Sequence, residues 1–262
     1  MTILDQIVAK KRDEIAAAQC RLPLAACRAA AASAPRDRRD FAAAIHAPGI
    51  RIIAEIKRAS PSRGDIDTGL DPAAVARAYV AGGAAALSVL TEPAFFKGSA
   101  ADLQAARRAV TLPVLRKDFI LDPYQLYETA ALGADAVLLI VRILPDPLLG
   151  ELHALARELG LDVLTEVYDD DDARRANAVG ADLIGINNRN LASFDTDVDH
   201  ASRLAAHIRP GACVVALSGI ASADDIRRNQ SAGITRFLVG ETLVRAPDPT
   251  ALLRSWTSIH AH

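Results

Sequence analysis

The sequence predicts a single (β/α)8 TIM barrel with an N-terminal helical extension, and two observations support this fold class. Eight short, almost continuously apolar segments recur along the chain, which is typical of parallel strands covered on both faces. Segments with helical periodicity separate them, and several of these end at a glycine. The eight predicted strands are residues 52–56, 85–90, 113–116, 135–141, 162–167, 182–187, 213–217 and 236–239.

The predicted helices begin after capping residues. Asp71 precedes Pro72, and an aspartate N-cap followed by proline at the first helical position favours a helix over residues 72–81. The other predicted helices are residues 123–132, 146–159, 169–179 and 222–232, each followed by Gly133, Gly160, Gly180 or Gly233. Eight βα units in about 210 residues fit a barrel. The alternative, a doubly wound sheet, usually has a glycine-rich first turn, and none follows Ile56.

The chain begins with a segment that lies outside the barrel pattern. Residues 2–19 carry apolar residues on one helical face, namely Ile3, Leu4, Ile7, Val8 and Ile15. A membrane-surface helix is the alternative, but the polar face has mixed charge, so packing against the barrel is favoured. Residues 33–40 are polar and loop-like. We therefore expect residues 1–50 to form a helical extension packed on a barrel of residues 51–262, with both parts in one structural domain.

Composition excludes several classes of protein. The 262 residues are 51% hydrophobic and 24% charged, as expected for a globular enzyme. Thirty Lys and Arg against 32 Asp and Glu give a net charge of −2, which argues against a nucleic-acid or polybasic membrane binder. Three cysteines without zinc spacing and the absence of a long apolar run predict a protein of the cytoplasm.

Charged residues gather at the carboxyl ends of the predicted strands, where barrel enzymes build their active sites. Alternation along the first strand places Glu55 and Lys57 on the same face. Lys117, Glu166 and Asn187 follow or end three other strands and would reach the same rim. Lysine and carboxylate side chains in such a mouth can transfer protons. The alternative for Glu55 and Lys57 is a buried structural ion pair.

The last two strands end differently, in Ser218-Gly219 and Gly240-Glu241. Glycines let backbone N–H groups approach an anion, and the loops after strands 7 and 8 form the usual phosphate site of a barrel. The alternative is that these two loops are only tight turns between a strand and a helix and bind no ligand. The residues alone therefore predict an enzyme that acts on a phosphorylated small molecule by proton transfer. Metal-binding motifs are absent from the sequence, so we predict no metal.

Six runs of residues resemble those of the indole-3-glycerol-phosphate synthase family, and together they span the barrel. They are AEIKRASPS at 54–62, LTE at 90–92 with FFKGS at 95–99, RKDFI at 116–120 with DPYQ at 122–125, GINNRNL at 185–191, SGI at 218–220 and VGETL at 239–243. The resemblance implies a decarboxylating ring closure and dehydration of 1-(2-carboxyphenylamino)-1-deoxyribulose 5-phosphate to indole-3-glycerol phosphate, in tryptophan biosynthesis and without a cofactor.

The resemblance also implies roles for individual residues. Lys117 would be the general acid in ring closure, and Glu166 would transfer a proton in dehydration. Lys57 would hold an anionic group of the substrate and assist dehydration as an acid. The resemblance further implies orienting roles for Glu55 and Asn187, substrate binding by Ser60, Arg189 and Phe119, and phosphate binding by Ser218, Gly219, Gly240 and the backbone N–H of Glu241.

Two other functions remain possible at this point: another phosphosugar barrel isomerase, or a non-catalytic barrel that binds a phosphorylated metabolite. The first would need other acid–base residues, typically Cys and Asp or paired Asp, at the strand ends. The second would keep the phosphate loops but lose Lys117 or Glu166, and both are present. We expect a monomer or weak homo-oligomer, compatible with contacts to other tryptophan-pathway enzymes. The polar segment 58–69 is the candidate lid.

Overall fold

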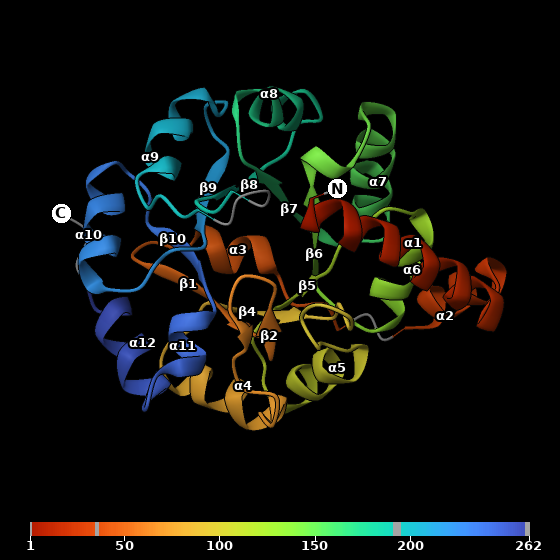
Figure 1. The fold of residues 1–262 in the computed structure, drawn as a ribbon, viewed down its shortest axis with the longest axis horizontal. Helices are drawn as coiled ribbons and strands as arrows, with labels where there is room; N and C mark the ends of the chain where they lie inside the picture. Colours follow the sequence, from red (N-terminus) through yellow and green to blue (C-terminus); the bar gives the residue numbers. More distant parts are fainter. Residues whose placement is uncertain (1, 35–36, 191–194, 260–262) are drawn as a thin grey trace.

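The structure, a computed structural model, describes residues 2–34, 37–190 and 195–259, and a closed barrel of parallel strands lies at its centre (Figure 1). Around the barrel the strands follow the order β1-β10-β9-β8-β7-β6-β5-β4. Their bounds are β1 Arg51–Ile56, β4 Ala86–Leu90, β5 Val114–Lys117, β6 Ala136–Ile140, β7 Asp162–Val167, β8 Leu183–Asn187, β9 Cys213–Leu217 and β10 Arg236–Val239. The predicted fold class is confirmed, and each predicted strand end lies within one residue of the observed end.

A small hairpin after the first strand was not predicted. After β1 the chain forms an antiparallel hairpin of β2 (Ala59–Ser60) and β3 (Gly64–Asp65), which falls within the candidate lid segment. The Arg58 guanidinium fixes the base of this hairpin by donating to the Asp102 carboxylate and to the Leu70 carbonyl at 2.9 Å. Strands of two residues carry no periodic signal, which is why the sequence pattern missed them.

Helices surround the barrel, and their capping residues explain where several of them begin. The Asp71 side chain accepts the Ala73 N–H, and Asp122 forms a capping box with Gln125. The outer helices are α4 Pro72–Ala81, α5 Ala100–Ala109, α6 Pro123–Ala131, η1 Val141–Ile143, α7 Asp146–Glu158, α8 Asp170–Ala178, α9 His200–Leu204, η2 Ala205–His207, α10 Ala223–Ser231, α11 Glu241–Arg245 and α12 Pro249–Thr257. The predicted helix at 169–179 thus has Asp169 as its N-cap.

Two buried layers hold the barrel together. One lies between the strands and the outer helices, and the other fills the inside of the barrel with aliphatic side chains such as Ile53, Leu115, Leu138, Leu164 and Leu238. Since the interior is packed, polar side chains on the inner face of the strands gather at the carboxyl end. This end is where the site residues lie.

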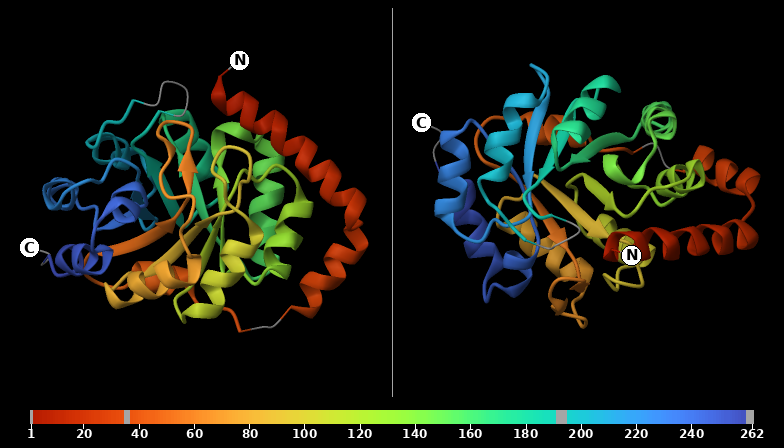
Figure 2. Two further views of the ribbon diagram at one scale, coloured as in Figure 1. Left: turned by 60° about the horizontal axis from the view of Figure 1, so that its bottom comes forward. Right: turned by 45° about the horizontal axis from the view of Figure 1, so that its top comes forward.

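Three helices precede the barrel: α1 (Ile3–Arg21), α2 (Leu24–Ser33) and α3 (Phe41–His46). Figure 2 shows α1 and α2 running along the outside of the barrel. Phe41 and Ile45 of α3 are fully buried and join the apolar cluster inside the barrel, so α3 closes the amino end. The Arg236 guanidinium holds α3 by donating to the carbonyls of its last residues. The amphipathic first helix is confirmed, whereas α2 and α3 were not predicted as separate helices.

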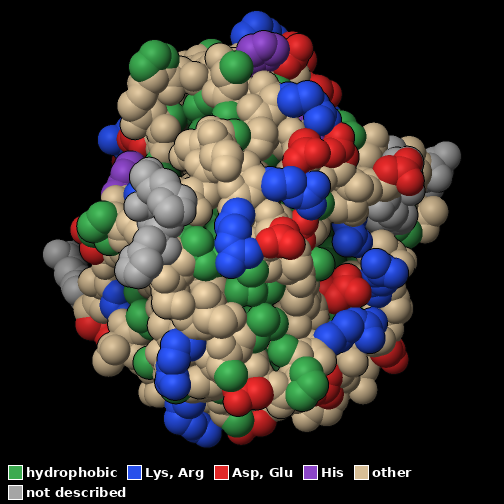
Figure 3. Space-filling model, turned by 90° about the vertical axis from the view of Figure 1, so that its left-hand side faces the viewer, with side chains coloured by type: hydrophobic (Ala, Val, Ile, Leu, Met, Phe, Trp, Pro, Cys, Tyr) green, Lys and Arg blue, Asp and Glu red, His purple; other side chains and the backbone are tan. Residues whose placement is uncertain are grey.

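The outer surface carries charges of both signs. Figure 3 shows Lys and Arg side chains interspersed with Asp and Glu on one face, without a continuous patch of either sign. Ion pairs on the outer helices, such as Arg227 with Asp224 at 2.7 Å, are mostly exposed. No described helix combines the length and the apolar character that a bilayer crossing requires.

Candidate active site

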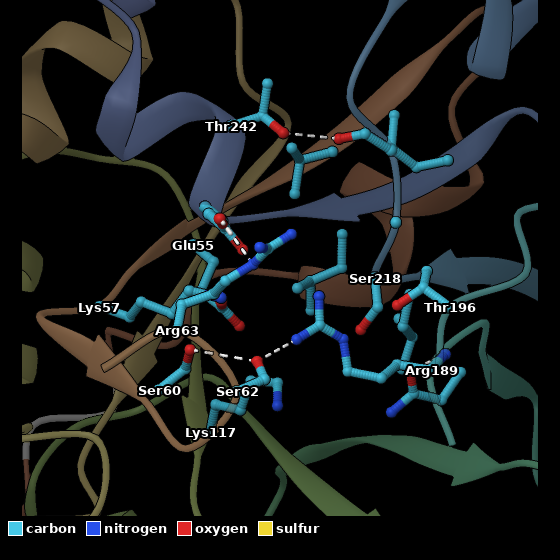
Figure 4. A pocket seen from close by; sticks show the side chains of 18 of the residues that line it. Glu55, Lys57, Ser60, Ser62, Arg63, Lys117, Arg189, Thr196, Ser218 and Thr242 are labelled. Atoms are coloured by element: carbon cyan, nitrogen blue, oxygen red, sulfur yellow. Dashed lines mark hydrogen bonds and ion pairs between the residues drawn. The ribbon is translucent and has the colours of Figure 1, made fainter. Parts of the chain in front are cut away.

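A pocket of about 750 Å³ opens at the carboxyl end of the barrel (Figure 4). Residues from seven barrel strands, the β2–β3 hairpin and helix α1 line it. All twelve residues that the sequence singled out lie in this one pocket: Glu55, Lys57, Ser60, Lys117, Phe119, Glu166, Asn187, Arg189, Ser218, Gly219, Gly240 and Glu241. Leu191, the last residue of the fourth run, lies outside the described residues.

Glu55 and Lys57 face the same side of β1, as alternation predicts. The Lys57 Nζ lies 2.9 Å from the Glu55 Oε1, and the Glu55 side chain is only 5% exposed. Burial alone would raise the Glu55 pKa, but the charges of Lys57 and Lys117 outweigh it and hold the pKa below its usual range. Glu55 is therefore an anion that holds Lys57 and faces Lys117.

Gly240 is needed because Glu55 lies against it. A Cβ at position 240 would come within 2.2 Å of the Glu55 Oε1, so any side chain there would displace the carboxylate. This contact is a second reason for glycine at the end of β10, besides the approach of an anion that the sequence predicts.

Lys117 is the last residue of β5, and it is half-buried. Among the described residues, its ammonium has no carboxylate within ion-pair distance, although its charge acts on Glu55. Neighbouring residues fix the strand end instead: the buried Arg116 guanidinium donates to the Asp118 carboxylate at 3.2 Å. Lys117 is thus a held but unpaired cation in the pocket.

Glu166 and Asn187 come from adjacent strands, β7 and β8. The Asn187 Nδ2 donates to the Glu166 Oε1 at 2.9 Å, and the Asn187 Oδ1 accepts the Arg189 backbone N–H at 3.0 Å. The other Glu166 oxygen, Oε2, is buried and has no hydrogen-bond partner in the described part of the chain. A buried carboxylate oxygen without a partner is costly, and it marks a position that a ligand can satisfy.

One wall of the pocket is apolar. The rings of Phe96 and Phe119 lie 6.0 Å apart, and Ile3, Leu4 and Ile7 reach the pocket from α1. Phe119 was predicted as a site residue, whereas Phe96 and the α1 residues were not. Their contribution depends on the first turns of α1 reaching the mouth of the barrel, which local periodicity does not reveal.

The loops after β9 and β10 form the opposite side. Ser218 and Gly219 both have left-handed backbone conformations, with φ of 64° and 79°. A Cβ on Gly219 would meet the Thr196 Cγ2 at 2.6 Å, so the turn is tightly packed. The Thr242 hydroxyl donates to the Ile220 carbonyl at 2.8 Å and joins the two loops.

The Glu241 side chain has two partners that were not predicted. The Arg63 Nε and the Arg245 Nε each lie 3.3 Å from its Oε1. Arg63 comes from the turn of the β2–β3 hairpin, and Ser62 beside it accepts a hydrogen bond from the Arg189 guanidinium. These contacts join segments far apart in sequence, so no local motif indicates them.

The closed parallel barrel, with a charged pocket at the carboxyl ends of its strands, has the architecture of a barrel enzyme. The sequence model of the family described as indole-3-glycerol phosphate synthase matches residues 4–256. The chain belongs to this family, whose members are decarboxylating lyases of tryptophan biosynthesis.

Relatives of the same name match nearly full length. An indole-3-glycerol phosphate synthase of Desulfosudis oleivorans is 54% identical over 257 residues, which are 96% of this chain and 97% of the relative. One of Chromobacterium violaceum is 48% identical over 251 residues, 94% of each chain.

Solved structures with low identity share the fold. The 3-hexulose-6-phosphate synthase of Salmonella typhimurium is similar with a TM-score of 0.63 and 15% identity, covering 81% of this chain and 100% of that one. The thiamine phosphate pyrophosphorylase of Pyrococcus furiosus has a TM-score of 0.58 and 18% identity, covering 79% of this chain and 93% of that one.

Proposed function

We propose that this pocket closes the indole ring of 1-(2-carboxyphenylamino)-1-deoxyribulose 5-phosphate, with Lys117 as the general acid and Glu166 as the general base. One observation carries the proposal: a lysine and a buried carboxylate oxygen line the same pocket, and neither has an ion-pair or hydrogen-bond partner in the part of the chain that the structure describes. A cation can protonate a carbonyl, and an unpartnered carboxylate can accept a proton. The apolar wall of Phe96 and Phe119 suits the aromatic ring of the substrate.

In the first step the ring carbon that bears the carboxylate attacks the ketose carbonyl. Lys117 donates its proton to the carbonyl oxygen as negative charge develops there, so the oxygen becomes a hydroxyl. The bond to the carboxylate then breaks, carbon dioxide leaves, and the electron pair of that bond restores the aromatic ring. Glu55 lies in the same pocket as an anion, because the charges of Lys57 and Lys117 hold its pKa below the usual range.

Dehydration completes the indole. Lys57 donates a proton to the new hydroxyl, which leaves as water, and Glu166 takes a proton from the carbon next to the ring nitrogen. The Asn187 amide holds the Glu166 carboxylate by one oxygen and leaves the other for this proton. The reaction consumes one proton overall, because a carboxylate leaves as neutral carbon dioxide.

The substrate phosphate would bind between the loops after β9 and β10. Ser218 and Gly219 line this side of the pocket, as do Gly240 and Glu241. Arg189 and Ser60 line the mouth between the phosphate side and the reacting atoms. An anion bound here leaves the aromatic end of the substrate against the apolar wall, which fits a substrate with one charged and one aromatic end.

The test is direct. Purified protein is mixed with the carboxyphenylamino deoxyribulose phosphate, and the fluorescence of the indole product is followed. Wild type and the control variant Glu158→Gln, which changes an exposed carboxylate at the end of α7, should form product equally fast. Glu166→Gln should form it at least about 10²-fold more slowly. A wild-type protein that forms no indole would overturn the proposal.

We further propose that the enzyme works in the cytoplasm as a monomer or weak homo-oligomer. Among the described residues, the exposed large apolar side chains are Leu22, Leu24 and Val80, each about 40% exposed. Large exposed apolar patches mark obligate interfaces, and so few side chains favour a weak interface or none. Sedimentation of the purified protein at several concentrations measures this.

A further inference from the structure

We propose that Arg63, at the turn of the β2–β3 hairpin, is a ligand of the substrate phosphate, and that the Glu241 carboxylate holds the Arg63 guanidinium until the phosphate replaces it. This inference rests on the proposed function, since it takes the phosphate to bind beside the loops after β9 and β10. It adds a side-chain cation from a third segment of the chain, and it gives the Glu241 side chain a role of its own.

The position of Arg63 supports a role in binding. Arg63 lines the pocket, and Figure 4 shows it projecting inward from the hairpin. Its Nε lies 3.3 Å from the Glu241 Oε1 across the mouth of the pocket. Hydrogen bonds from Arg58 fix the base of the hairpin, so the position of the turn that carries Arg63 is defined by these contacts.

The charges around Glu241 exceed what one carboxylate can neutralise. Arg63 and Arg245 both pair with it, and its charge also acts on Arg189, so three guanidinium groups face one carboxylate. Their net charge is +2, equal and opposite to that of a phosphate monoester dianion. Like charges gathered without a counter-ion repel one another, so this cluster favours binding of an anion.

Arg189 also has a guanidinium group that an anion could satisfy. Burial lowers the pKa of Arg189, and the charge of Arg63 lowers it further, while Glu241 opposes both effects. Its Nε is buried and lacks a hydrogen-bond acceptor among the described residues. An acceptor with several oxygens placed between Arg63 and Arg189 would satisfy both groups, and guanidinium groups bind phosphate oxygens in this way.

The ion pair between Arg63 and Glu241 is weak enough for a phosphate to replace Glu241 as the partner of Arg63. The Arg63 side chain is 59% exposed, and an ion pair in contact with water is weak. A dianion offers Arg63 a stronger charge-assisted contact than a carboxylate does. Phosphate binding would therefore take Arg63 from Glu241 and hold the hairpin over the occupied pocket.

The experiment measures binding of inorganic phosphate by calorimetry at pH 7.5, together with turnover of the phosphorylated substrate. Arg63→Gln should weaken phosphate binding by about tenfold and raise the KM of the substrate similarly, with kcat little changed. Glu241→Gln should strengthen phosphate binding, because the carboxylate no longer competes for Arg63. Arg227→Gln, which removes an equally exposed arginine from an ion pair on α10, should change neither value.

The two variants separate this proposal from a structural role of the pair. If Arg63 and Glu241 only hold the hairpin, both variants should change phosphate binding in the same direction, and that result would overturn the proposal. Unchanged phosphate binding in Arg63→Gln would overturn it as well. A wild type that binds phosphate but forms no indole would instead count against the proposed function alone, because phosphate binding does not depend on turnover.

Discussion

Lys11 of helix α1 and Asp118 of the loop after β5 form an ion pair of 2.8 Å in which both side chains are almost fully buried, at 5% and 1% exposure. Asp118 lies between Lys117 and Phe119, two residues of the pocket, and its other oxygen contacts the buried Arg116. The pair therefore ties the N-terminal helix to the strand end that carries the proposed general acid.

Breaking this pair should destabilise the protein. Lys11→Met fills similar space but leaves Asp118 with Arg116 as its remaining cation, and loss of one partner of a buried pair costs about 3 kcal/mol or more. The control Lys10→Met changes an exposed lysine on the same helix and should change the free energy of unfolding by less than about 0.5 kcal/mol. Urea denaturation at pH 7 measures both. Equal stability of the two variants would mean that α1 is not held by Lys11.

The same pair predicts a dependence of stability on pH. Burial opposes ionisation of Asp118, but Arg116 and Lys11 outweigh it and hold its pKa below the usual range. A carboxylate with a lowered folded pKa contributes stability above its unfolded pKa of about 3.9, and this is lost as pH falls through the folded pKa. The pKa of Lys11 is raised, because Asp118 and Glu14 outweigh its burial, so its contribution is lost only at alkaline pH.

The comparison of wild type with Asp118→Asn checks this dependence. The variant removes the charge between Lys11 and Arg116 and leaves each with one carboxylate, Glu14 at 2.6 Å and Glu128 at 2.7 Å, so we expect a loss of about 3 kcal/mol at pH 7. The difference between the two proteins should stay constant between pH 5 and 8 and shrink below about pH 4, where wild type loses the same charge. A difference that is independent of pH down to pH 2 would show that the Asp118 charge does not stabilise the fold.

The sequence predicts most of the barrel because its strands are short apolar runs, several of which follow a glycine that ends the preceding helix. It predicts the polar rim because parallel strands bring their carboxyl ends together, so Lys117 and Glu166 can be placed without a structure. Burial of Lys11 could not be predicted in the same way. A lysine on a helix is normally solvated, and only the position of α1 against the β5 loop shows that it has a buried partner.

The Arg63–Glu241 contact could not be predicted from the sequence either, because it also depends on how distant segments pack together. Position 241 follows a glycine at a strand end, which points to its backbone N–H, while the side-chain partners come from the hairpin and from α11. Gly240 is the converse case. The sequence indicates why an anion would need glycine there, and the structure adds that the Glu55 carboxylate fills the space a side chain would take.

A charge placed in the loop after β9 should weaken phosphate binding. Gly219 has a left-handed φ, and a Cβ there meets Thr196, so any substitution strains the turn. Gly219→Asn carries nearly the same side chain without the charge and is the matched control for Gly219→Asp. The aspartate variant should bind inorganic phosphate at least tenfold more weakly than the asparagine variant, about 1.4 kcal/mol. Equal affinity would remove this loop from the phosphate site.

Lys117 and Glu166 should act at different steps, and substrate labelled in its carboxylate can separate them. Lys117→Ala removes both the proton and the charge needed for ring closure, so turnover should fall about 10²–10⁴-fold and little labelled carbon dioxide should be released. Glu166→Gln keeps an oxygen for the Asn187 amide but removes the base. Turnover should also fall, because the reaction should stop after decarboxylation and before loss of water.

A single-turnover experiment that measures labelled carbon dioxide and indole product in the same sample distinguishes the steps in which Lys117 and Glu166 act. Glu166→Gln should release carbon dioxide in excess of indole, because the closed and decarboxylated intermediate waits for loss of water. Lys117→Ala should release neither at an appreciable rate. Since the two residues stand on different strands, β5 and β7, neither substitution removes the other side chain from the pocket. If both variants keep carbon dioxide and indole strictly in step, the two residues serve the same step, and the division of roles is wrong.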